Sequence, residues 1–478
     1  MQNVTGSRLA ALALAAAVTI GAVAATTAPA ASNVSAAGPC GPLGNLVEFQ
    51  LNDRCDYGTG RNPMRVGGAA IVAALQQAGL FATRLRCANG VVAPIVAVPN
   101  QLLITAGSPE RLNFALQITR RRLINQVVGD PRPVNALAAV QPLLPGTLTP
   151  EFLTSVVPRL QGQGFSVDLN YLEPALPKDH FRPFDNPTPA KAATAGRGGK
   201  GSVLVVDSPP NRRLFGLDGR FGPTAKYDLD GNGLVDEDHG HGVFVAALVK
   251  RYAPSAKVYL AGVRGRQVPG LARWTPMMFS DADLIRAMST AFELSPGGTA
   301  VRRSFNVVNL SLGGAGCEGI GDRLPLGRFM RDLAAIAGKT TGVTPWYVAA
   351  AGNDGADVKH FPAAWRDTPT IQLAADAVAL SDPAAANEIL QIQTALHRRM
   401  IAVGSWRAGV KDRFSNCGTW VNGIAPGARA VSRFPSPTTR HWAKWSGTSF
   451  ATPQVSARLV GGANPGGVAR GESIGACP

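Results

Sequence analysis

The chain has 478 residues, of which 45% are hydrophobic and 16% are charged. This length exceeds that of one ordinary domain, so we expect two domains plus processing segments, with enough apolar residues to bury a sizeable core. The net charge of +16 suggests a nucleic-acid partner, but the basic residues are dispersed and are not interleaved with aromatic residues. That distribution disfavours nucleic-acid binding, and a preference for acidic substrates or surfaces stays open.

The first thirty residues have the form of a secretory signal peptide. Arg8 supplies a positive start, Leu9 to Val23 is an apolar run, and Ala28-Pro29-Ala30 offers a cleavage site of small residues. The alternative is a membrane anchor, but the run is short for a span and no positive cluster follows it. We therefore predict a secreted protein, extracellular or periplasmic, with no membrane span.

Residues 31–177 alternate between helical and strand patterns at a size that suits a small α+β domain. The periodicity predicts helices over Ala69–Ala78 and Arg111–Val128, and strands over Gln101–Thr105 and Phe165–Leu172. Residues 178–200 are rich in Pro, Gly and Lys, which predicts an exposed linker open to proteolysis.

Residues 201–478 alternate regularly between short apolar strands and helices, which predicts a doubly wound, mostly parallel α/β sheet with helices on both faces. Ligand sites in such sheets lie at the carboxyl ends of the strands. The expected strands are Val203–Val206, Val258–Val263, Val307–Leu310, Trp346–Ala351 and Met400–Val403, and the expected helices are His241–Tyr252, Asp281–Leu294 and Phe329–Ala337.

The cysteines divide evenly across the linker, with Cys40, Cys55 and Cys87 before it and Cys317, Cys417 and Cys477 after it. In an exported protein we expect disulfides. Because each half holds an odd number, either a disulfide joins the halves or each half keeps one free thiol. The sequence leaves both possibilities open, and no CxxC spacing indicates a zinc site.

Two segments bring an acid and a base to the start of the second domain. Asp207 follows the apolar strand 203–206, and His241 opens an apolar helix with a glycine on either side. In serine hydrolases a carboxylate orients an imidazole, and the imidazole acts as the general base that activates the serine nucleophile. Each residue alone has an ordinary interpretation, a turn former for Asp207 and a structural histidine for His241, and His239 is a less well placed rival.

Two further segments supply a nucleophile and an anion donor. Ser449 lies at a helix start, where free backbone N–H groups point at a developing negative charge. Asn353 follows a strand of small residues, and its amide could donate to an oxyanion. A helix-capping serine and a turn asparagine are the alternatives for the isolated residues.

Taken together and in this order, these segments resemble the subtilisin family, the subtilases. The segment Gly447-Thr448-Ser449-Phe450-Ala451-Thr452-Pro453 matches the family's Gly-Thr-Ser-x-Ala-x-Pro motif. The segments around Asn353 and Asn309–Gly314 are further matches, and the resemblance covers roughly residues 200 to 460. The order Asp, His, Ser and the oxyanion asparagine are those known from subtilisin itself.

The resemblance implies a serine endopeptidase that acts on protein or peptide substrates, requires no cofactor for its chemistry, and functions as a monomer. Ser449 would be the nucleophile, His241 the general base and acid, Asp207 its orienting group, and Asn353 an oxyanion donor. Ser311, Leu312, Gly313, Ala351 and Gly352 would line the substrate cleft. The N-terminal domain would be a propeptide, making the chain a zymogen. A catalytically inactive, subtilase-like binding protein is the alternative.

Two departures from the family pattern affect residues beside the reacting groups. After His241-Gly242 the family usually has Thr-His-Val-Ala-Gly, whereas this chain has Val243-Phe244-Val245-Ala246-Ala247. Asp207 is followed by Ser208-Pro209 where the family has Ser or Thr and then Gly. Neither change removes a reacting group, but both change the residues that support one.

The segment 228–236 carries oxygen side chains at alternate positions around a glycine turn, which resembles an EF-hand-type calcium loop. His239 stands where such a loop has its bidentate glutamate, so a complete EF-hand is not expected. The candidate ligands of a structural calcium ion are Asp228, Asp230, Asn232 and Asp236, with an acidic surface turn as the alternative.

Overall fold

The computed structural model describes an N-terminal region, residues 79–86 and 92–174, and a C-terminal region that begins at residue 201 and ends at residue 462. The C-terminal region is described over 201–210, 216–224, 237–265, 278–316, 323–367, 382–434 and 442–462, and a few positions at 76–77, 182–183 and 372–379 are described as well. The predicted signal peptide, most of the linker and the candidate calcium ligands lie outside the described residues.

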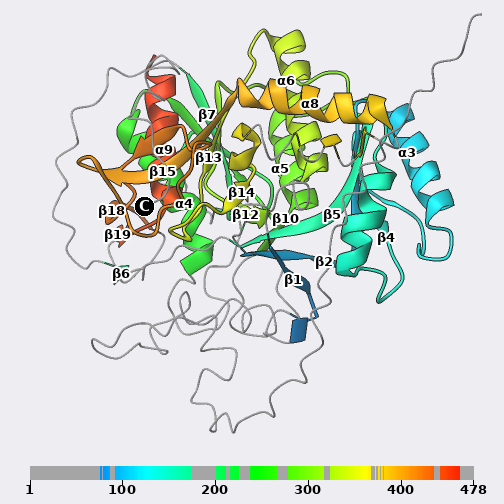
Figure 1. Ribbon diagram of the computed structural model, residues 1–478. Coiled ribbons are helices and arrows are strands. Elements are labelled where there is room, and N and C mark those ends of the chain that lie inside the picture. Colours follow the sequence, from blue (N-terminus) through cyan, green and yellow to red (C-terminus); the bar gives the residue numbers. More distant parts are fainter. Residues whose placement is uncertain are drawn as a thin grey trace, which may run out of the picture. The chain divides into compact units, whose positions relative to one another are not determined.

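The N-terminal region folds as an antiparallel sheet with a helix against it (Figure 1). Its strands pair in the order β5-β2-β4-β3, and β1 also pairs with β2. The elements are β1 (Phe81–Arg86), β2 (Val92–Ala106), α3 (Pro109–Arg122), β3 (Arg132–Asn135), β4 (Ala138–Pro142), the helical turns η1 (Phe152–Val156) and η2 (Val157–Leu160), and β5 (Phe165–Pro174).

The C-terminal region is a mostly parallel sheet covered by helices. Its elements are β7 (Ser202–Asp207), β8 (Gly219–Phe221), α4 (Glu237–Tyr252), β9 (Lys257–Gly262), β10 (Met278–Ser280), α5 (Asp281–Phe292), β11 (Val307–Leu310), β12 (Gly314–Gly316), α6 (Leu324–Thr341), β13 (Trp346–Ala350), β14 (Lys359–Phe361), η3 (Ala363–Arg366), α8 (Pro383–His397), β15 (Met400–Arg407), β16 (Val410–Lys411), β17 (Gly423–Ala425), β18 (Ala430–Arg433), β19 (Trp442–Trp445) and α9 (Thr448–Val460). A short strand from the linker, β6 (Arg182–Pro183), pairs with β19.

The order of the central strands sets the position of the site. Strands β8, β9, β7, β11, β13 and β15 lie side by side and pair in parallel. The chain begins at β7, adds β9 on one side, and then returns to add β11, β13 and β15 on the other. The order therefore reverses between β7 and β11, and a doubly wound sheet binds its ligands at such a reversal, beyond the carboxyl ends of the strands.

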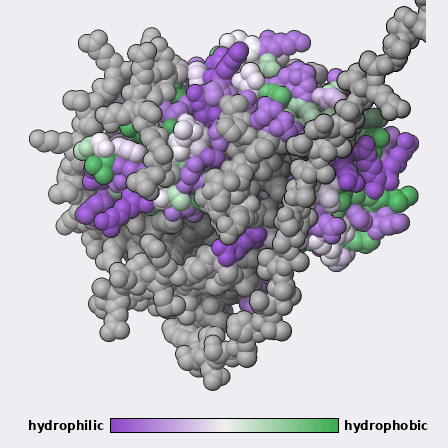
Figure 2. Space-filling model, in the orientation of Figure 1, coloured by the Kyte–Doolittle hydropathy of each residue, from purple (hydrophilic) through white to green (hydrophobic). Residues whose placement is uncertain are grey.

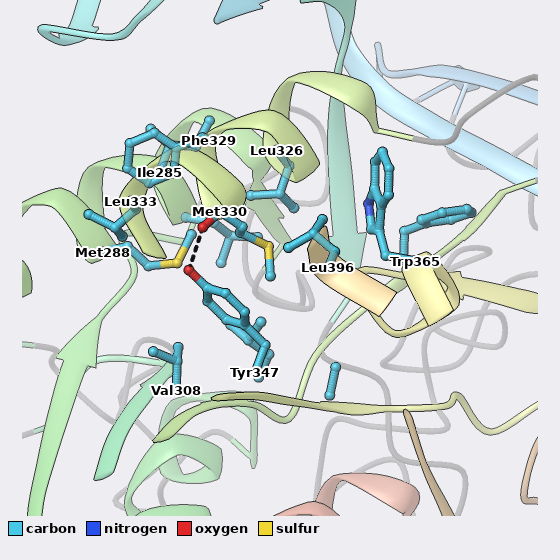
Figure 3. Packing of buried hydrophobic residues seen from close by; sticks show 14 of the residues in the cluster. Ile285, Met288, Val308, Leu326, Phe329, Met330, Leu333, Tyr347, Trp365 and Leu396 are labelled. Carbon is cyan, nitrogen blue, oxygen red and sulfur yellow. Dashed lines mark hydrogen bonds between the residues drawn. The ribbon is translucent and has the colours of Figure 1, made fainter. Parts of the chain in front are cut away.

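Alternate residues of β7 face opposite layers of the molecule, as its unbroken apolar pattern predicts for a strand buried on both faces. Val203 and Val205 pack into one core with α4 and α9, while Leu204 and Val206 pack into another core with α5 and α6. Figure 3 shows part of the second core, where the Tyr347 hydroxyl donates to the Met330 carbonyl at 2.7 Å. The prediction of helices on both faces is correct.

The sheet of the N-terminal region is also buried on both faces. On β2, Leu102 and Ile104 belong to the core beneath α3, whereas Leu103 between them packs into the core that contains α5 and α6. β5 extends the contact, because it pairs antiparallel with β10 of the C-terminal region, with Leu172 opposite Ser280. The N-terminal region therefore packs against the C-terminal region across a broad face.

Among the helices, α3 and α8 show the most informative differences from the sequence prediction, while α4 and α6 extend beyond their predicted bounds. α3 ends at Arg122 and not at Val128, because the chain turns there and runs back toward β4, where the Val128 N–H donates to the Pro142 carbonyl at 3.2 Å. α8 was not predicted at all. It begins at an Asp382 cap followed by Pro383, and its alanine-rich first turns weaken the apolar periodicity on which the prediction relied.

On the described part of the face in Figure 2, hydrophilic side chains dominate, with some hydrophobic ones among them. Among the helices that the structure describes, none combines the length and apolarity needed to cross a bilayer. Cys417 is buried and disulfide-bonded. The sequence leaves the pairing among the six cysteines open.

Candidate active site

Asp207 and His241 meet at the carboxyl end of β7. Asp207 is the last residue of the strand and is fully buried, and His241 lies in the first turns of α4 with 1% of its surface exposed. The His241 Nδ1 lies 2.8 Å from one Asp207 carboxylate oxygen and 3.0 Å from the other. The Ser208 N–H donates to the same carboxylate at 2.6 Å, and this hydrogen bond helps to fix the orientation of the carboxylate toward the ring.

The glycines on either side of His241 allow this close approach. A Cβ on Gly242 would lie 2.3 Å from the Ser208 carbonyl oxygen, and a Cβ on Gly240 would lie 1.9 Å from the Phe434 ring. A side chain at Gly242 would push α4 away from the end of β7, and one at Gly240 would displace the Phe434 ring. The Gly242 N–H also donates to the Ser208 hydroxyl at 2.7 Å, which gives a structural role to a serine that departs from the family pattern.

Aromatic rings surround the imidazole on its other sides. Trp445 meets the His241 ring edge-on at a centroid distance of 5.3 Å, and Phe450 lies at 5.4 Å. Phe244 packs against Phe450 at 4.7 Å and against Trp445 at 5.6 Å. The departure from the family pattern at Phe244 therefore has a physical explanation, because Phe244 completes an aromatic cluster that restricts the His241 ring.

Ser449 is the second residue of α9, and its position is tied to the end of β11. Its hydroxyl donates to the Ser311 carbonyl at 3.0 Å, and the Ser311 hydroxyl donates to the Ser449 carbonyl at 2.8 Å. The second bond depends on Pro453, which lies inside α9 and has no N–H to offer the carbonyl four residues earlier. Ser311 takes the place of that missing helix bond.

Ser311 is in turn held by a chain of buried polar side chains. The Asn309 amide donates to the Ser311 hydroxyl at 2.9 Å, and the Ser456 hydroxyl donates to Asn309 at 2.9 Å. One end of this hydrogen-bond network, Ser456, therefore lies on α9 itself, about two helical turns beyond the candidate nucleophile Ser449. The network joins strand and helix into one unit around Ser449.

The contacts of Asn353 settle which way its amide points. The Thr448 backbone N–H donates to the Asn353 side chain at 2.9 Å, and the Thr448 hydroxyl lies 3.0 Å from the same atom. Because a backbone N–H can only donate, the atom facing it must be the amide oxygen. The amide nitrogen of Asn353 therefore points away from Thr448, on the side where a Cβ built on Gly447 would lie 3.6 Å from it.

The structure brings the four predicted catalytic residues to one edge of the sheet. Asp207 ends β7, Asn353 follows β13, Ser449 begins α9 and His241 lies near the start of α4. The Ser449 hydroxyl is bonded to Ser311, and the His241 Nε2 is buried with no hydrogen-bond partner among the described residues. A nucleophile–base bond is often long or absent before substrate binds, so this geometry is compatible with a resting site.

The predicted substrate-binding residues lie in two segments beside the nucleophile. Ser311, Leu312 and Gly313 continue from β11, and a Cβ on Gly313 would lie 3.0 Å from the Phe361 carbonyl oxygen. Ala351 is fully buried, and Gly352 has a left-handed φ of +102°, where its missing side chain leaves room for Asn416 and His360. No cluster of metal-ligating side chains occurs in the part of the chain that the structure describes.

A buried Asp–His pair beside a serine at a helix start is the arrangement of a serine hydrolase. The chain belongs to the subtilase family, whose sequence profile matches residues 202–461, more than half of its length. It is accordingly a subtilisin-like serine endopeptidase. A search of curated proteins found no match.

Several solved structures are similar to a little over half of the chain. They include the protease domain of PatA (20% identity, 55% of this chain and 80% of that chain, TM-score 0.35) and the prenylagaramide maturation protease PagA (20%, 56% and 76%, TM-score 0.36). A lanthipeptide protease matches with 17% identity over 55% of this chain and 73% of that chain, with a TM-score of 0.36. The family assignment rests on the profile and not on these structures.

Sequence reasoning missed the aromatic cluster and the donor that the Ser449 carbonyl finds in Ser311. Trp445 and Phe434 reach His241 and its helix from a strand pair far along the chain, so no local pattern points to them. A signal did exist for Ser311. A proline four residues after the Ser449 candidate leaves one helix carbonyl without its usual donor, and a buried donor was therefore to be expected nearby.

Proposed function

We propose that this subtilase cleaves peptide bonds through an acyl-enzyme on Ser449, with His241 as general base and then general acid. The observation that carries the proposal is the buried contact of 2.8 and 3.0 Å between the His241 Nδ1 and the Asp207 carboxylate. It presents Nδ1–H to Asp207 and leaves Nε2 as the basic nitrogen. Asp207 orients the ring and stabilises the imidazolium.

The reaction follows from these positions. The Ser449 hydroxyl leaves its bond to the Ser311 carbonyl, transfers its proton to the His241 Nε2, and attacks the scissile carbonyl. The negative charge that develops on the carbonyl oxygen is met by the Asn353 amide and the Ser449 N–H. His241 then gives the proton to the departing amine, and a water molecule repeats the sequence to release the acid.

A fluorophosphonate probe tests the proposal, because it labels only an activated serine. We expect wild type to be labelled and Ser449→Ala to remain unlabelled, while Thr290→Ala, which removes an exposed hydroxyl on α5, is labelled like wild type. Wild-type protein that is folded but not labelled would contradict the proposed chemistry.

We propose further that Ser311–Gly313 and Ala351–Gly352 wall the substrate cleft and that the N-terminal region is a propeptide. The propeptide role is supported by the antiparallel pairing of β5 with β10 and by the broad packing against α5 and α6. In the labelling experiment, self-removal would appear as trimming near residues 178–200, which Ser449→Ala would lack.

The remaining proposals rest on the sequence. The protein is exported through its N-terminal signal peptide, is held by disulfides, and acts as a monomer. A structural calcium ion is bound by the 228–236 loop, which leads into α4 and His241. Calorimetry tests the last point: a chelator should lower the melting temperature, and an unchanged temperature would contradict a calcium site.

A further inference from the structure

One face of β5 is polar, although the strand is buried in the molecule. Val167 and Leu169 point into the core of the N-terminal region. Between them and on either side, Ser166, Asp168 and Asn170 point the other way, and all three are 5% exposed or less. Buried polar side chains are retained where they have partners, so the partners of this face show what it binds.

The partners belong to the C-terminal region. The Arg328 guanidinium on α6 donates to the Ser166 hydroxyl at 2.9 Å, and the Ala282 N–H at the start of α5 donates to the Asn170 side chain at 3.1 Å. Asn170 thereby satisfies one of the N–H groups that a helix start leaves without an internal partner. The polar face of β5 is therefore complementary to the beginnings of α5 and α6.

Asp168, in the middle of this face, is linked through Tyr171 to a buried ion pair. Arg323, directly before α6, contacts Asp281, the first residue of α5, at 3.0 Å, and both side chains are almost fully buried. The Arg323 guanidinium lies 5.3 Å from the centre of the Tyr171 ring, and the Tyr171 hydroxyl donates to Asp168 at 2.8 Å. Two carboxylates, Asp168 and Asp281, thus share the surroundings of one guanidinium.

We infer that the Asp281–Arg323 pair is the docking point for the N-terminal region, and that this region docks with the Asp168 carboxyl carrying its proton. A neutral carboxyl can lie beside Asp281 without repulsion, whereas a second buried carboxylate would need a second cation. The inference rests on the proposed propeptide role, and it makes release of the N-terminal region from the enzyme a response to rising pH.

The pKa of Asp168 is higher in the docked state than it would be in water, so rising pH weakens docking. Burial, with a further contribution from Asp281, raises the pKa of Asp168 to about 7, while the Tyr171 hydroxyl, the Leu169 N–H and Arg323 act against the rise. Once undocked and facing water, the carboxyl would have an ordinary pKa of about 4. Docking is therefore unimpaired below about pH 4, weakens as the pH rises toward 7, and reaches its lowest affinity above that.

Other ionisable groups at the interface lie toward its far end. Burial raises the pKa of Asp332 on α6, whose carboxylate lies 3.7 Å from where a Cβ on Gly107 would stand, so it acts in the same direction. Burial opposes ionisation of Glu388, but hydrogen bonds from Arg328 and from the Gly164 N–H lower its pKa, so it is ionised throughout the range from 5 to 8. On β2, the residue paired with Asp168 is the apolar Leu103.

The test compares Asp168→Asn with wild type, because asparagine has the shape of a protonated carboxyl and cannot ionise. In self-processed protein, gel filtration at fixed ionic strength should show the affinity for the cleaved N-terminal region falling at least about tenfold between pH 5 and pH 7. The Asp168→Asn complex should change less than about threefold. The matched control is Asp130→Asn, at an exposed position of the same region.

A second arm does not depend on peptidase activity. In the Ser449→Ala chain the N-terminal region stays attached, and its melting temperature should fall between pH 5 and pH 7 but fall less when Asp168→Asn is added. Tyr171→Phe should extend the fall to higher pH, because the lost hydroxyl no longer favours the carboxylate.

The outcomes separate the two proposals. Equal pH dependence of affinity and melting temperature in Asp168→Asn and wild type would overturn the inference. A pH dependence that is removed by Asp332→Asn but not by Asp168→Asn would overturn it as well. A chain that shows the expected melting behaviour but is never labelled or processed would leave the docking inference standing and reject the proposed chemistry.

Discussion

Two buried aspartates in this protein have the same local support and opposite surroundings. Asp207 and Asp168 each accept a hydrogen bond from the N–H of the following residue, at 2.6 and 2.8 Å. Asp207 then meets an imidazole, which can carry a positive charge, whereas Asp168 meets a phenol and lies near a second carboxylate. The local backbone contact is the same, so the neighbours contributed by distant parts of the chain decide the role of each acid.

Removing His241, the partner that distinguishes Asp207 from Asp168, should have the largest effect on activity. We expect His241→Ala to lower kcat by about a million-fold, the size of loss known from subtilisin itself when its histidine or serine is removed. Steady-state hydrolysis of a peptide substrate measures it. A matched His397→Ala variant, altered at the end of α8, should keep wild-type activity, and a comparable loss there would indicate a general defect in folding.

Removal of the proposed oxyanion donor, Asn353, should have the next largest effect. Asn353→Ala should lower kcat about 100- to 1000-fold with little change in KM, as removal of the oxyanion-hole amide does in subtilisin itself. The measurement is kcat and KM on the same peptide. A rise in KM at constant kcat would mean that Asn353 holds substrate and not the transition state.

The smallest change concerns the close approach of α4 to β7. Gly242→Ala places a methyl group 2.3 Å from the Ser208 carbonyl oxygen, and we expect a loss of about 1–3 kcal/mol in the free energy of unfolding together with a lower kcat. Urea unfolding and activity assays measure both. Gly297→Ala is the control, because its added methyl would only come within 3.8 Å of the Thr299 hydroxyl.

Much of the arrangement of the candidate site could be predicted because its residues lie at the ends of strongly apolar strands or at the starts of helices. Val203–Val206 identifies β7, and an acid at its exit can only lie at the sheet edge, where Asn353 and Ser449 also fall. The interface residues could not be predicted in this way. Asp168 looks like one polar residue in an alternating strand, and only the packing of β5 against α5 and α6 shows that it is buried.

The glycines beside His241 show an intermediate case. Their presence predicted a close approach of backbones, but the atoms they approach, Ser208 and Phe434, come from β7 and from the end of β18. Likewise Phe244 read as a departure from the family pattern until its partners Trp445 and Phe450 were in place. A local sequence signal therefore identified the positions, and tertiary packing supplied the reasons.

The proline in α9 has a consequence for anyone who redesigns this enzyme. Because Pro453 withholds a donor from the Ser449 carbonyl and Ser311 replaces it, the two residues form a single functional unit divided between helix and strand. Removing the Ser311 hydroxyl alone leaves the buried Ser449 carbonyl without this donor, whereas changing both residues restores an ordinary helix but removes one of the bonds that join it to the end of β11. A graft of the Ser449 helix into another scaffold must therefore carry the strand end with it.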